Sequence, residues 1–273
     1  MTAPSPFDGA IDPKTLIGSA TGAGVKVAVL DSGLDLAHPM MESVRGQLKG
    51  LGIFLSGKYE EWAEPSDPYG HGTPVTWIVN QAAPEAELHF FRVLDDEGGC
   101  SPEVFHAALS YAVENDFQVV NLSLGLEQEV NDYWKVRFLE LAEQAYYKDM
   151  VLVGAASNSY DWIVPASFSC VVSVNSTYFQ DPLAFRARDR SALLFGPKPH
   201  IWLDAQGDMV LAPRANSQSN FYYIGTSFAA PNVTGVVARI LSRFPELKPF
   251  EVKTLLYRMG LHYSASQADA AAG

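Results

Sequence analysis

Short, nearly continuous apolar runs recur along this chain, and longer segments with a helical spacing of apolar residues separate them. Runs of this length, rich in valine and leucine, are typical of strands buried on both faces of a parallel sheet. They cover residues 25–30, 86–94, 118–125, 150–157 and 170–174. The pattern therefore predicts a sheet whose strands lie inside the protein.

Two of the intervening segments place their apolar residues on one face of a helix. The first has Phe105, Ala108, Leu109, Ala112 and Val113, and the second has Trp134, Phe138, Leu141, Ala142 and Ala145. Ser101 and Pro102 suit the start of the first helix. Strands that alternate with helices indicate βαβ units with right-handed crossovers. The predicted fold is therefore α/β, with a central, mostly parallel sheet flanked by helices.

One domain accounts for most of the chain, because no linker or internal repeat divides it. Residues 1–24, rich in Gly, Pro, Ser and Ala, predict an irregular N-terminal arm. Residues 25–260 form the expected domain, in which 178–223 should hold loops and short strands. Residues 261–273 are expected to be a flexible tail.

Charge and composition exclude some classes of protein. The chain of 273 residues has 31 acidic and 19 basic side chains, a formal net charge of −12. Such a balance argues against a nucleic-acid partner, since phosphates require a basic surface. No apolar run reaches transmembrane length, and the N-terminus does not resemble a signal peptide. We therefore expect a soluble, cytoplasmic protein without a membrane partner, and its oligomeric state stays open.

The two cysteines, Cys100 and Cys170, have no metal-binding spacing. Two free thiols in a reducing compartment is the favoured interpretation, and a disulfide is the alternative.

Four polar residues stand where sheet proteins often place their chemistry. Asp31 directly follows the first predicted strand, Asn158 follows the fourth, and His71 lies between two glycines. Ser227 lies at a predicted helix start, where unpaired N–H groups favour negative charge. Each has an ordinary alternative: Asp31 and Asn158 as turn residues, His71 as a loop histidine, and Ser227 as a helix cap.

Together the four residues supply a complete set for nucleophilic catalysis. A serine hydroxyl needs a base, and the base needs an orienting carboxylate. An asparagine amide can donate a hydrogen bond to a developing oxyanion. The order Asp, His, Ser along the chain is the order found in subtilisin.

Three motifs carry a resemblance to the subtilase family of serine peptidases. They are "VAVLDSGLDLAHP" around Asp31, "GHGTPV" around His71 and "GTSFAAPNVTG" around Ser227. The segments "VVNLSLG" and "GAASN" are also similar to family segments, so the resemblance spans about residues 25–259. It implies a three-layer, subtilisin-like sandwich and a serine endopeptidase.

The resemblance also implies a role for each matching residue. Ser227 would be the nucleophile, His71 the general base and then acid, and Asp31 the residue that orients His71. Asn158 and the Ser227 N–H would form the oxyanion hole. A protein or peptide substrate would bind as an added strand against two edges. The implied substrate-binding residues are Gly98, Gly99, Cys100, Ser123, Leu124, Gly125, Ala155 and Ala156.

The chain departs from the family pattern at Pro74, Trp77, Phe228 and Asn232, none of which carries the chemistry. The segment from His71 to Pro84 is shorter than in secreted relatives, so we expect no calcium from that loop and no cofactor. Only thirty residues precede Asp31, and residues 1–24 could restrain the enzyme by crossing its groove. A peptide-maturation protease or transpeptidase and a silent, peptide-binding pseudoprotease are the alternatives to a cytoplasmic endopeptidase with a restricted substrate.

Overall fold

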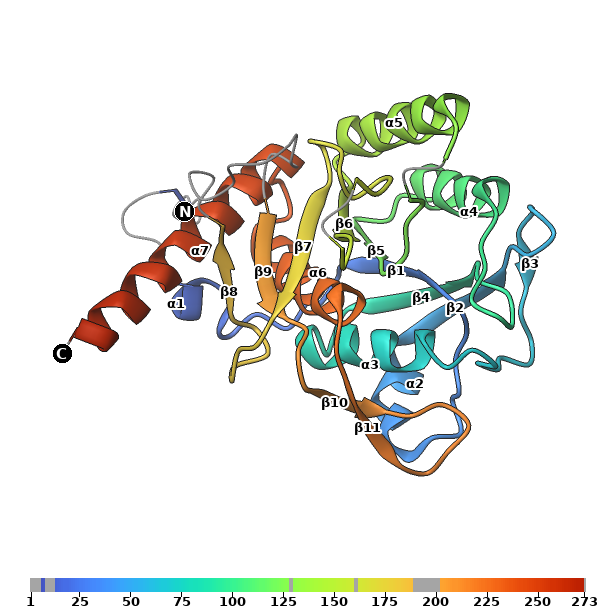
Figure 1. The fold of residues 1–273 in the computed structure, drawn as a ribbon, viewed down its shortest axis with the longest axis horizontal. Coiled ribbons are helices and arrows are strands. Elements are labelled where there is room, and N and C mark those ends of the chain that lie inside the picture. Colours follow the sequence, from blue (N-terminus) through green and yellow to red (C-terminus); the bar gives the residue numbers. More distant parts are fainter. Residues whose placement is uncertain (1–5, 8–12, 128–129, 160–161, 189–201, 273) are drawn as a thin grey trace.

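A nine-stranded sheet runs through the centre of the protein (Figure 1). The computed structural model describes residues 6–7, 13–127, 130–159, 162–188 and 202–272. Neighbouring strands are parallel except at the two edges, where β3 pairs with β2 and β8 pairs with β9. In spatial order the strands are β3 (Glu60–Glu61), β2 (Leu48–Ile53), β4 (Glu87–Arg92), β1 (Lys26–Asp31), β5 (Val119–Leu122), β6 (Val151–Ala155), β7 (Val172–Thr177), β9 (Trp202–Gln206) and β8 (Phe185–Ala187).

The five apolar runs in the sequence correspond to β1, β4, β5, β6 and β7, which confirms the predicted α/β fold. Strand β1 shows why its run is continuous. Val27 and Val29 belong to one hydrophobic core, whereas Ala28 and Leu30 belong to the core on the other face. All four side chains are fully buried, because successive residues of a strand point to opposite faces.

Helices cover both faces of the sheet and complete a three-layer sandwich (Figure 1). One face holds α2 (Glu42–Gln47), α3 (Gly72–Ala82), α6 (Thr226–Arg243) and α7 (Pro249–Ala272). The other face holds the two predicted amphipathic helices, α4 (Pro102–Glu114) and α5 (Asp132–Tyr147). A Cβ at Gly235 would lie 2.2 Å from the Ala82 Cβ, so α3 and α6 approach closely there. Within the described residues, no helix has both the length and the apolarity to cross a membrane.

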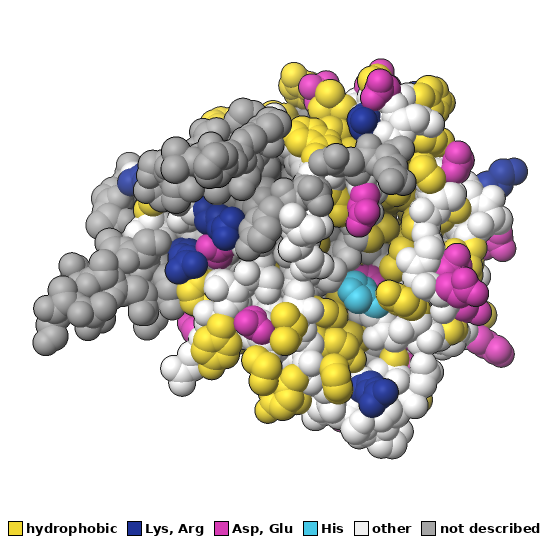
Figure 2. Space-filling model, in the orientation of Figure 1, with side chains coloured by type: hydrophobic (Ala, Val, Ile, Leu, Met, Phe, Trp, Pro, Cys, Tyr) yellow, Lys and Arg dark blue, Asp and Glu magenta, His cyan; other side chains and the backbone are white. Residues whose placement is uncertain are grey.

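An antiparallel hairpin of β10 (Val210–Pro213) and β11 (Asn220–Tyr223) stands apart from the main sheet and leads into α6. Figure 2 shows hydrophobic side chains gathered over this hairpin. Four of them are at least 45% exposed: Leu211, Phe221, Tyr222 and Ile224. Strands β8 to β11 agree with the expected short strands of 178–223, of which 189–201 lie outside the described residues.

Both ends of the chain have more regular structure than the sequence indicated. A short helix, α1 (Pro13–Ile17), interrupts the arm, and Arg243 donates hydrogen bonds to the carbonyls of Thr15 and Leu16. Arg243 ends α6, about 24 Å from Ser227 at 1.5 Å per residue. Thr15 and Leu16 therefore lie far from Ser227. At the other end, residues 261–272 continue α7, a helix that the sequence pattern did not indicate there.

Candidate active site

The three residues of the predicted triad lie at element ends that meet on one side of the sheet. Asp31 is the last residue of β1, His71 immediately precedes α3, and Ser227 is the second residue of α6. The Asp31 and His71 segments pack backbone against backbone, because a Cβ at Gly72 would lie 2.3 Å from the Gly33 carbonyl oxygen. Only glycine permits this approach, which fixes the spacing of the Asp31 and His71 side chains.

Asp31 and His71 form the acid–base half of the site. The Nδ1 atom of His71 lies 2.7 Å from Oδ1 of Asp31, which is fully buried and also accepts from the Ser32 N–H at 2.7 Å. Burial opposes the charged form of His71, but the charge of Asp31, its hydrogen bond and the charge of Asp67 outweigh this. The pKa of His71 is therefore raised above its ordinary value.

Ser227 is held against the end of β5. Its Oγ donates to the Ser123 carbonyl oxygen at 3.0 Å, and Ser123 Oγ donates to the Ser227 carbonyl oxygen at 2.8 Å. Among the described contacts, the hydroxyl thus pairs with Ser123 and not with His71. Rotation about the first side-chain torsion of Ser227 gives the hydroxyl new partners without moving the backbone. The Phe228 ring lies 5.3 Å from the His71 ring and packs against it.

Asn158 contacts the start of α6. Its Oδ1 accepts a hydrogen bond from the Thr226 N–H at 3.1 Å, at the start of α6. This bond fixes which end of the amide faces Thr226 and leaves the Nδ2 group on the other side as a donor. The helix start adds unpaired N–H groups and a positive field where negative charge would develop.

A buried carboxylate that the sequence analysis did not single out organises the segments around the triad. Asp67 is fully buried and accepts four hydrogen bonds, from Ser32 Oγ, Gly70 N, Thr73 N and Thr73 Oγ1, at 2.6–2.9 Å. Ser32 Oγ in turn accepts from the His71 and Gly72 N–H groups at 3.3 and 2.9 Å. Asp67 therefore joins the segment after Asp31 to the segment around His71.

The expected substrate-binding segments flank this centre. A Cβ at Gly125 would lie 2.6 Å from Cγ1 of Ile163, so the Ser123–Gly125 segment packs closely against Ile163. On the opposite edge, the Gly99 N–H and carbonyl already pair with the carboxylate and N–H of Asp95 at 2.7 and 2.9 Å. Burial and the Asp95 charge raise the pKa of the Cys100 thiol to about 12, which keeps it protonated. Ala155 ends β6 and Ala156 follows it, both buried.

The residues described in the structure include no group of three or more His, Cys, Asp or Glu side chains placed to hold a metal ion. The site is built from a carboxylate, an imidazole, a hydroxyl and an amide, which is the set required for acyl transfer through a serine nucleophile.

The chain matches a model described as the subtilase family over residues 22–267. It therefore belongs to that family, and by class it is a subtilisin-like serine peptidase, a hydrolase. Membership implies protein or peptide substrates.

Individual relatives agree with this assignment. The chain is 32% identical to the "Thermostable alkaline protease" of Halalkalibacterium halodurans over 244 residues, which are 82% of this chain and 58% of that protein. It is 31% identical to the "Major intracellular serine protease" of Bacillus subtilis over 238 residues, 81% of this chain and 69% of that protein. The solved structure of "Sphericase" has the same fold, with a TM-score of 0.69 and 22% identity over 89% of this chain and 86% of that one.

Proposed function

We propose that this chain is an active endopeptidase that hydrolyses peptide bonds through an acyl-enzyme on Ser227. The observation that carries the proposal is the 2.7 Å contact between Asp31 and His71, beside a serine at the start of α6. This arrangement supplies a base of fixed tautomer and a nucleophile within one site.

In the first step, His71 accepts the Ser227 proton while Oγ bonds to the substrate carbonyl carbon, and the carbonyl electron pair moves to its oxygen. Asn158 Nδ2 and the Ser227 N–H stabilise that oxyanion. The C–N bond then breaks, and His71 gives its proton to the leaving amine. Water, deprotonated by His71, attacks the ester in the same way and releases the acid and free Ser227.

We further propose that the enzyme acts inside the cell on a restricted protein or peptide substrate. Two features support an intracellular location: the name of the relative from Bacillus subtilis, and the two unpaired thiols Cys100 and Cys170. The substrate would lie as an extended strand between the Gly98–Cys100 and Ser123–Gly125 edges.

Labelling with a fluorophosphonate probe, followed by intact mass, tests the proposed activity. We expect one adduct per chain on the wild type and none on Ser227→Ala, because only an activated serine attacks the probe. A folded wild-type protein that takes no adduct would instead support the silent, peptide-binding alternative. Product analysis with added amines separates hydrolysis from transpeptidation.

Substitution of Asn158 by alanine should lower kcat by about 10²–10³ and leave KM nearly unchanged, because the amide acts mainly in the transition state. This magnitude is the one known for an oxyanion-hole donor of subtilisin. Steady-state kinetics on a cleaved peptide would measure it. Equal kcat values for the variant and the wild type would remove Asn158 from the oxyanion hole.

A further inference from the structure

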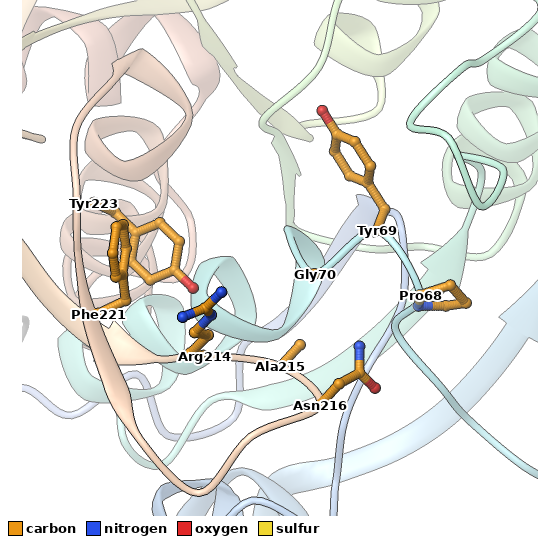
Figure 3. Close-up of a pocket in the computed structure, with 8 residues that line it drawn as sticks. All are labelled: Pro68, Tyr69, Gly70, Arg214, Ala215, Asn216, Phe221 and Tyr223. Atoms are coloured by element: carbon orange, nitrogen blue, oxygen red, sulfur yellow. The ribbon is translucent and has the colours of Figure 1, made fainter.

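A pocket of about 360 Å³ lies beside the catalytic histidine, between the segment that precedes α3 and the β10–β11 hairpin (Figure 3). Tyr69 and Gly70 line it from the α3 side, and Arg214, Asn216 and Tyr223 line it from the hairpin side. In Figure 3 the Arg214 side chain extends between the Tyr223 ring and Gly70. The pocket therefore combines aromatic walls with one cationic side chain.

Two of the residues that line this pocket connect it to His71. Gly70 is covalently next to His71, and the Tyr223 ring lies 4.7 Å from the Phe228 ring, which contacts His71 at 5.3 Å. The end of β5, where Ser123 binds Ser227, lies on the other side of α3 from the hairpin (Figure 1). If the acyl part of a substrate occupies the β5 edge, as the proposed function requires, the leaving part must extend toward this pocket.

Arg214 is the feature that gives the pocket its chemistry. Its side chain is exposed and stacks at 5.7 Å on the Phe221 ring, and no carboxylate among the described residues forms an ion pair with it. A stacked, unpaired guanidinium keeps its fork of donors available for a carboxylate. The chain as a whole is acidic, with a formal net charge of −12, whereas the charged side chain that lines this pocket is a cation.

The two neighbouring carboxylates, Asp67 and Asp35, hydrogen-bond to neutral donors and form no ion pair with Arg214. Asp67 is buried beneath the pocket and holds four hydrogen bonds. Asp35 accepts from the N–H groups of Asn216 and Ala37 at 2.8 and 3.1 Å. The Asn216 amide also donates to the Asp67 carbonyl oxygen at 2.7 Å, which fixes the floor of the pocket in place.

We propose that this pocket binds a carboxylate on the leaving-group side of the substrate, within the first three residues after the scissile bond. The inference rests on the proposed endopeptidase function and deepens it by naming a substrate class. Three residues is the limit because an extended chain advances about 3.3 Å per residue and the pocket begins at Gly70, the residue before His71. The carboxylate is that of an Asp or Glu side chain or of a peptide C-terminus.

A degenerate peptide library with amidated C-termini tests this preference. After digestion, the new N-termini are sequenced by mass spectrometry. Wild-type protein should enrich Asp and Glu about tenfold at one of the first three positions, since charge-assisted hydrogen bonds are the strong ones. Arg214→Gln should lose this enrichment, and Arg258→Gln, which removes another exposed positive charge, on α7, should keep it. Enrichment that Arg214→Gln retains overturns the proposal. Enrichment that is absent in the wild type excludes an Asp or Glu side chain and leaves only the peptide C-terminus, which the binding experiment below tests.

Binding to Ser227→Ala protein separates this proposal from the function on which it rests. Fluorescence anisotropy would compare a Glu-containing peptide amide, its Gln counterpart, and the Gln peptide with a free C-terminus. We expect about tenfold tighter binding for the first or the third than for the Gln amide, and no difference when Arg214→Gln is added. Equal binding of all three overturns the carboxylate pocket, while the fluorophosphonate adduct on Ser227 reports on the catalytic function independently.

Discussion

Asp31→Asn should lower kcat/KM by about 10⁴ while the protein stays folded, the largest effect on activity that we expect from an isosteric change in the site. The amide has two orientations. With its oxygen toward His71 it keeps the hydrogen bond but loses the charge that stabilises the imidazolium. With its nitrogen toward His71 it donates to Nδ1 and imposes the wrong tautomer. The Oδ2 position offers no compensation, because it is buried without a hydrogen-bond partner among the described residues.

Peptide hydrolysis across a pH series would measure this effect and its cause. The wild-type kcat/KM should fall as the pH drops through the pKa of His71, because the base must be neutral to accept the Ser227 proton. Since the pKa of His71 is raised, the wild-type acid limb should lie at higher pH than for an ordinary histidine. In Asp31→Asn the residual activity should show its acid limb at lower pH. Asp132→Asn, which removes a charge that is 96% exposed on α5, is the matched control. A loss of less than tenfold would contradict the assigned role of Asp31.

The candidate catalytic residues could be singled out in the sequence because each one follows a local signal. Asp31 and Asn158 come directly after apolar runs, His71 lies between glycines, and Ser227 precedes a helical pattern. Parallel strands bring their carboxyl ends to one edge of the sheet, so these local positions meet in space. The three layers of helix, sheet and helix could also be predicted, because the apolar spacing of each strand and helix is a local signal.

Asp67 could not be predicted in this way, because its burial depends on residues distant in the chain. In the sequence it stands in a polar segment and is indistinguishable from a solvated turn residue. Its partners include Ser32, 35 residues earlier, and the two groups of Thr73. The only signal in the sequence that could have pointed to Asp67 is its position four residues before His71, in "DPYGHGT". The hydroxyl partner of Ser227 and the pocket beside Tyr69 likewise arise from tertiary packing alone.

The C-terminal segment shows a different limit. Its composition, rich in Ala and Ser, predicts a flexible tail and did not indicate that α7 extends through Ala272. Alanine has the highest intrinsic helix propensity, and this signal favours continuation of an existing helix. Because the start of α7 is anchored by core residues such as Val252 and Leu255, elongation requires no new nucleation.

Asp67→Asn should produce the largest loss of stability, about 3 kcal/mol in the free energy of unfolding. An amide can accept the hydrogen bonds of Ser32 and Gly70 through its oxygen, but its NH₂ group then faces the two donors of Thr73. Leaving buried donors unpaired costs about 1–3 kcal/mol each, and the lost charge weakens the remaining bonds. Urea unfolding would measure the difference against Asp132→Asn, for which less than about 0.5 kcal/mol is expected.

The same variant separates a positioning role of Asp67 from a purely structural one. The negative charge of Asp67 is one of the causes that raise the pKa of His71. If Asp67 acts on the catalytic base, the acid limb of kcat/KM should move to lower pH in Asp67→Asn, measured at a temperature where the variant is fully folded. Packing damage alone lowers activity at every pH and leaves the limb in place. An unshifted limb would therefore restrict Asp67 to holding the two segments together, and a shifted one would make it part of the electrostatic environment that tunes His71.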